Sequence, residues 1–291
     1  MNAVKARAPA IFDRIYSSNN RARLERWIVA AAVVLFAAHL ACIFAARHLA
    51  NPPAPVSAAG KNFLSAIYTP FSVILFYEVL VLIAAIPQSA TRGLETQYEI
   101  VSLIFVRGFF KDIASLDVGS IRAPLGELSP ALVDAGAGLL MFLLVALFGR
   151  AAGEAPAYQA SPAMERLIAW KKRIALVLTV VFLWFAAASV YQVEFEIFHP
   201  AATVGESRAG FYAEVFTAMI FTDVLILLLS LLASDRYEEV FRNAAFVIAA
   251  ILIRFSLTAA HPLGAILGIA GMLFGIFTLV IYNFRRGAAR E

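Results

Sequence analysis

Long apolar runs, separated by short polar segments, make up most of the chain. A helix of about 20 apolar residues is long enough to cross the ~30 Å hydrocarbon core of a bilayer. Pro87 directly follows the second of these runs and is expected to end its helix. The pattern predicts eight transmembrane helices, at residues 27–46, 64–86, 98–116, 132–149, 174–193, 211–233, 240–260 and 263–284.

Basic residues in the polar segments give a test of this number. Lysine and arginine are concentrated in residues 1–26, in the WKKR stretch at 170–173 and in residues 285–291. Segments of this kind lie on the cytoplasmic side of a membrane. If both tails are cytoplasmic, the number of spans must be even. This argues for keeping the third span, 98–116, although it contains Arg107.

Composition agrees with an all-α, polytopic integral membrane protein. The chain is 62% hydrophobic and 15% charged, whereas a soluble protein has about 25% charged residues. The formal net charge of +4 is explained by membrane topology, and the basic residues are scattered over loops, so no nucleic-acid partner is expected. The compact loops and the tails rich in alanine and arginine favour a bacterial inner membrane, with both termini cytoplasmic.

The N-terminal tail has two interpretations. Ile11, Phe12, Ile15 and Tyr16 recur at helical spacing beside Arg14. This spacing predicts a short amphipathic helix that lies on the membrane surface. The alternative is a disordered tail, which the sequence does not exclude.

The loop after the fourth span divides the spans into two groups of four. FYEVLVLIAAI, which contains Glu78, aligns with FTDVLILLLSL, which contains Asp223. IVSLIFVRGF, with Arg107, aligns with VIAAILIRFS, with Arg254. Because such charges are rare at mid-membrane, their recurrence in the same order predicts two parallel four-helix repeats, although chance placement would also give it. The predicted parts are a tail at 1–26, a repeat at 27–149, a linker at 150–172, a repeat at 173–284 and a tail at 285–291.

The four charged residues of this alignment are the candidate site. Glu78 lies about ten residues from the cytoplasmic end of its predicted helix, and Arg107 lies about as far from the start of the next. Consecutive antiparallel helices therefore bring the two side chains to similar depth. The same count holds approximately for Asp223 and Arg254. An unpaired charge at the bilayer centre is costly, so we expect the ion pairs Glu78–Arg107 and Asp223–Arg254, or cross-pairs between the halves.

Further polar residues could outline a route to these pairs. Tyr77 adjoins Glu78, Lys111 follows Arg107 by one helical turn, and Glu99 and Glu214 lie nearer the ends of their spans. Each of them has an alternative interpretation as an ordinary residue of the membrane interface.

Recognisable catalytic chemistry is absent from the sequence. There is no H-E-x-x-H, G-x-S-x-G, P-loop or dinucleotide-binding motif. Cys42 is the single cysteine, so the chain can form neither an internal disulfide nor a cysteine metal site. The four histidines are not spaced as metal or haem ligands on one helix. We therefore expect neither an enzyme nor a bound cofactor or metal.

Two functions fit these features. The leading hypothesis is a small transporter or channel for an ion, a proton or a small anion, in which the buried charges line the path. The alternative is a scaffold or accessory subunit, in which the ion pairs fasten helices together. The expected partners are the lipid bilayer and, depending on the function, a small ion or anion, a second copy of the chain or another membrane protein.

Overall fold

The computed structural model describes residues 2–49, 52–53, 56, 62–115, 125–153, 162–198, 207–231 and 236–288, and these contain no β-strand. Nine helices lie within these ranges: α1 (Asn2–Ile15), α2 (Ser18–His48), α4 (Ser65–Ala85), α5 (Ala90–Ser115), α6 (Leu125–Ala152), α7 (Pro162–Phe198), α8 (Ser207–Leu231), α9 (Tyr237–Thr258) and α10 (Leu263–Ala288).

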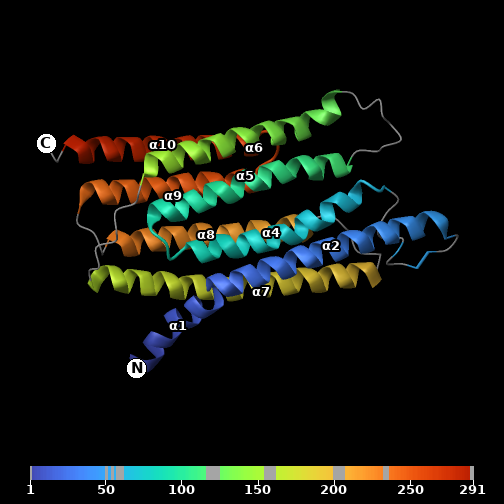
Figure 1. Ribbon diagram of the computed structural model, residues 1–291, viewed down its shortest axis with the longest axis horizontal. Coiled ribbons are helices and arrows are strands. Elements are labelled where there is room, and N and C mark those ends of the chain that lie inside the picture. Colours follow the sequence, from blue (N-terminus) through green and yellow to red (C-terminus); the bar gives the residue numbers. More distant parts are fainter. Residues whose placement is uncertain are drawn as a thin grey trace.

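The helices from α2 to α10 lie side by side along the long axis of the molecule (Figure 1). Helices α2, α4, α5 and α6 form one layer, in which each packs on the next, and α7 to α10 form a second layer in the same way. The layers meet where α6 packs on α10, α5 on α9 and α4 on α7. Helix α1 points toward the end of the bundle at which α10 finishes (Figure 1).

Among the residues that the structure describes, six helices are long and apolar enough to cross a membrane: α2, α4 and α9, together with the stretches Leu128–Ala152 of α6, Glu214–Leu231 of α8 and Leu263–Arg285 of α10. The architecture is therefore that of a helical, multi-pass membrane protein. The other two predicted spans fall in α5 and α7. Helix α5 carries six charged residues, and in α7 the charged cluster Lys171–Arg173 lies just before the predicted span.

Two clusters of buried apolar side chains hold the bundle together. One lies among α5, α6, α9 and α10 and includes Tyr98, Met141 and Met272. The other lies among α1, α4, α5, α7 and α8 and includes Ile83 and Phe182. Many large apolar side chains on the outside are exposed, among them those of α2, α6 and α10. Such a surface is suited to lipid, because acyl chains are as apolar as these side chains.

The N-terminal tail is helical, as one of its two interpretations required. Phe12 of α1 is buried in the cluster shared with α7 and α8. The Tyr16 hydroxyl hydrogen bonds with that of Thr179 at 2.7 Å, and Asp13 pairs with Lys172 at 2.6 Å. Helix α1 is thus docked on α7 by apolar, hydroxyl and charged contacts together.

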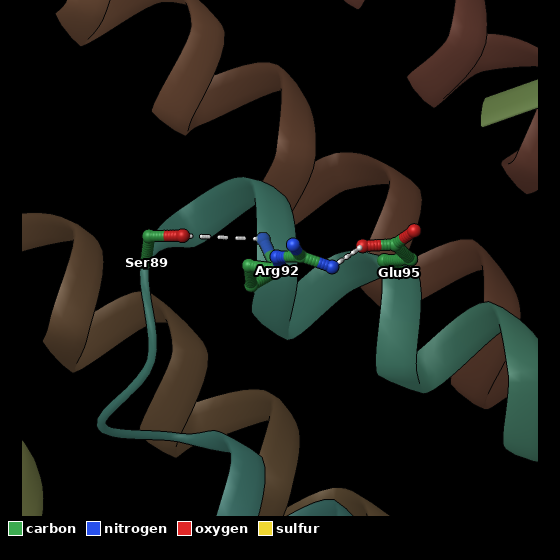
Figure 2. A network of polar contacts seen from close by, with 3 residues as sticks. All are labelled: Ser89, Arg92 and Glu95. Carbon is green, nitrogen blue, oxygen red and sulfur yellow. Dashed lines mark hydrogen bonds and ion pairs between the residues drawn. The ribbon is translucent and has the colours of Figure 1, made fainter. Parts of the chain in front are cut away.

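A short turn sets the relative position of α4 and α5. Helix α4 ends before Pro87, as predicted, because proline cannot continue the backbone hydrogen bonds of a helix. Ser89 then caps α5: its hydroxyl accepts a hydrogen bond from the backbone N–H of Arg92 at 3.3 Å. Figure 2 shows this cap and the exposed ion pair between Arg92 and Glu95, at 3.2 Å. The two helices therefore run antiparallel as close neighbours.

Lys171 of α7 contacts the turn between α4 and α5. Its ammonium group donates a hydrogen bond to the carbonyl oxygen of Gln88 at 3.1 Å, just beyond the end of α4. A cation is favourable there because the carbonyls at a helix C-terminus carry partial negative charge. The side chain is nevertheless buried, and burial lowers its pKa from 10.5 to about 8.

We expect the protein to become more stable as the pH rises above about 8. Below that pH, Lys171 is charged in the folded and the unfolded protein, and folding carries the cost of burying the charge. Between about pH 8 and pH 10.5 the folded protein has released the proton while the unfolded chain still binds it, so stability increases. The gain over this window is about 2–3 kcal/mol.

Thermal unfolding in detergent across this pH window measures the effect. Lys171→Met removes the titrating group, and the increase in melting temperature should disappear. Lys172→Met is the matched control, because Lys172 is next in sequence and pairs with Asp13 instead of a helix end. An equal increase in Lys171→Met would assign the effect to another group.

Candidate functional site

The first pair joins two consecutive helices. Glu78 of α4 and Arg107 of α5 form a bidentate ion pair, in which both terminal nitrogens of the guanidinium group contact the carboxylate. The side chain of Glu78 is 6% exposed and that of Arg107 is 15% exposed. Two parallel N–H donors match a carboxylate in geometry as well as in charge. The short turn between α4 and α5 brings the two side chains to the same height in the bundle.

The second pair repeats this arrangement in the other layer. Asp223 of α8 and Arg254 of α9 form an ion pair through Oδ2 and Nη1. Here the arginine is the more deeply buried partner: its side chain is 4% exposed, against 12% for Asp223. In each pair, one side chain is almost fully enclosed and its partner reaches the surface.

The two pairs occupy matching places in their helices. Arg107 and Arg254 each lie seventeen residues after the first residue of their helix, which is about 25 Å along the axis. Glu78 and Asp223 lie seven and eight residues before the last residue of theirs. The arginine-bearing helices α5 and α9 also pack on each other. Each layer thus contains one acid–arginine pair, and the two arginines lie on neighbouring helices.

The other predicted residues lie elsewhere. Tyr77 is half-buried and faces Arg21 and Glu25 of α2. Lys111, Glu99 and Glu214 are exposed on the outside of the bundle. Within the described ranges, none of these four residues makes a hydrogen bond or an ion pair with a member of either acid–arginine pair. Their role in lining a path stays a prediction.

A third polar contact was not predicted. Asp134 of α6 lies 3.2 Å from the Nε2 atom of His261, in the turn between α9 and α10. Gly108 of α5 makes room for it, because a Cβ atom there would overlap the Asp134 carboxylate. The signals in the sequence were an acid near the start of the fourth span and a histidine before a proline, but neither indicates the other as its partner.

The chemistry open to the site follows from its charges. Each pair is neutral as a whole, and its carboxylate can accept a proton. A guanidinium group keeps its proton at every physiological pH and can bind a carboxylate, nitrate or phosphate group. Within the described ranges, no group of three or more His, Cys, Asp or Glu residues is placed to hold a metal ion. By these charges, the carboxylates could take up a proton and the guanidinium groups could bind an anion.

Comparison with known proteins adds no family to this description. No protein-family model, no curated protein and no solved structure matches the chain.

Proposed function

We propose that the protein is a small membrane transporter whose polar centre consists of Glu78, Arg107, Asp223 and Arg254. The observation that carries this proposal is the presence of two buried acid–arginine pairs at matching places in a bundle of membrane type. Ionisable residues within membrane proteins are costly and commonly mark ion paths and proton relays. Closed ion pairs favour a transporter that switches between states over an open pore, because a pore requires water where the pairs lie.

The membrane topology forms part of the proposal. All eight helices from α2 to α10 cross the bilayer, including α5 and α7, and both termini are in the cytoplasm of a bacterium. The two layers are parallel repeats about an axis along the membrane normal. Three features support this topology. Arg107 and Arg254 lie equally far from the starts of their helices, α5 packs on α9, and α6 packs on α10. The two ends of the described chain, in α1 and α10, also lie at the same end of the bundle (Figure 1).

Flux through reconstituted liposomes tests the proposal. The purified protein is incorporated with dyes for pH and for ions, and the wild type is compared with Glu78→Gln and Arg107→Gln. We expect each variant to lose at least about tenfold in transport rate, since each removes a charge at the polar centre. Arg92→Gln is the matched control, because it breaks an exposed pair at the end of the same helix. Equal flux in all four proteins would refute the role of Glu78 and Arg107 in transport, and no flux in any of them would refute transport itself.

The alternative is a scaffold or accessory subunit, and the low exposure of Glu78 and Arg254 favours it, because a pair that only fastens helices needs no access. The charge-swapped protein Glu78→Arg/Arg107→Glu separates the two functions. An ion pair that only holds two helices together still forms when the acid and the arginine are exchanged. A scaffold should therefore regain folding and co-purification with its partner. In a transporter, the swap should restore folding without restoring flux, because the acid then stands on the other helix.

A further inference from the structure

The two residues of each pair differ in whether they can lose their charge. Arginine stays charged at every pH a cell experiences, whereas a carboxylate can be neutralised by one proton. Glu78 is therefore the member of the first pair that can change charge, and Arg107 is the member that always needs a counter-charge. This asymmetry restricts which ions can pass without leaving a net charge inside the bundle.

Four loading events can be compared by the net charge they leave. A proton alone neutralises Glu78 and leaves Arg107 as an unpaired cation. A metal cation bound to the carboxylate leaves a net positive charge, and an anion bound to the guanidinium group leaves a net negative one. A proton together with a monovalent anion leaves the site neutral, as it was before loading. Because isolated charge within a membrane is expensive, the last event is the favoured one.

Resting on the transport function proposed above, we propose that the protein carries a proton and a small monovalent oxyanion together, without net movement of charge. The proton forms an O–H bond with the Glu78 carboxylate. The N–H groups of Arg107 then donate their hydrogen bonds to the anion instead of to that carboxylate. On the other side of the membrane the O–H bond breaks, the proton and the anion leave, and the ion pair forms again.

The structure assigns this role to the first pair. The Arg107 side chain is 15% exposed, whereas that of Arg254 is 4% exposed and enclosed. In the second pair the acid is the more exposed partner, since the Asp223 side chain is 12% exposed. The bidentate contact with Glu78 also shows that the Arg107 donors are arranged for two oxygens of a planar group. An oxyanion such as nitrate fits these donors better than a spherical halide.

Anion binding is tested first without transport. Glu78→Gln imitates the protonated acid and leaves Arg107 without a counter-charge. In this variant, sodium nitrate should raise the melting temperature by roughly 3–5 °C, and sodium chloride at equal ionic strength should raise it less. The double variant Glu78→Gln/Arg107→Gln is the matched control, in which nitrate should act no more strongly than chloride. An equal nitrate effect in both variants would overturn the assignment to Arg107.

Transport in liposomes then tests the coupling. With nitrate outside and a pH dye inside, wild-type vesicles should acidify, and clamping the membrane potential with potassium and valinomycin should leave the rate unchanged. Empty vesicles measure the leak. Flux that changes with the potential, or flux of a cation without nitrate, would overturn the proton–anion mechanism and leave the transporter in place. No flux of any ion would overturn the transport function itself.

Discussion

Replacing Arg254 by leucine is expected to lower the free energy of unfolding by about 3–5 kcal/mol. The guanidinium group pairs with Asp223, and its side chain is only 4% exposed. Without it, the largely buried Asp223 carboxylate loses its counter-charge. The loss is measured by unfolding the purified protein with a denaturing detergent and comparing the midpoints of the wild type and the variant.

Two further variants show whether the lost pair is the cause. Asp223→Leu/Arg254→Leu removes both charges and should recover most of the stability, because an apolar pair of similar volume is tolerated where a single charge is not. Arg92→Leu breaks the exposed Arg92–Glu95 pair, in which the arginine is 61% exposed, and should cost less than about 1 kcal/mol. If Arg254→Leu costs no more than Arg92→Leu, the inner pair does not stabilise the fold.

Hydropathy located the helices well wherever most of a helix surface is apolar. The second predicted span, 64–86, corresponds to α4, and Pro87 follows its end. It missed the polar starts of α2, α5 and α7. Helix α5 begins at Ala90, eight residues before the predicted span, because Ser89 caps it there and a polar segment can continue a helix beyond the membrane core. A run of apolar residues indicates the part of a helix that is suited to the membrane core and does not indicate the polar residues by which the helix extends beyond it.

Counting along the helices was sufficient to place acids beside arginines. Glu78 and Arg107 lie on consecutive antiparallel helices joined by a short turn, so equal distance from that turn implies equal depth. Depth alone does not give the direction of a side chain. Lys111 follows Arg107 by one turn and is nevertheless exposed, because direction depends on which helices pack against α5. The function of the pairs, as distinct from their contact, stays a prediction.

Contacts between distant segments could not be derived from the pattern. Asp134 and His261 meet because α6 packs closely on α5 at Gly108 and the α9–α10 turn reaches the same end of the bundle. In the same way, the hydrogen bond from Lys171 to Gln88 depends on where α7 lies. One sequence shows the polar residues that need partners, and only the packing of the helices shows which partners they have.

The close approach of α5 and α10 gives the last prediction. Tyr98 is fully buried, and its hydroxyl donates a hydrogen bond to the carbonyl oxygen of Gly271 at 3.1 Å. A Cβ atom at Gly275 would overlap that hydroxyl and would also lie 3.2 Å from Leu94. Gly275→Ala is therefore expected to cost about 3–4 kcal/mol, through overpacking and loss of the hydrogen bond. Detergent unfolding midpoints measure this cost.

Two comparisons distinguish this steric effect from a general effect of alanine. Gly136→Ala adds the same methyl group where nothing lies within 4 Å, so it should be neutral or slightly stabilising, since glycine is unfavourable within a helix. Tyr98→Phe should cost about 1 kcal/mol alone and should relieve part of the damage when it is combined with Gly275→Ala, because it removes the overlapping oxygen. Additive losses in that double variant would mean that α5 and α10 do not meet at these two residues.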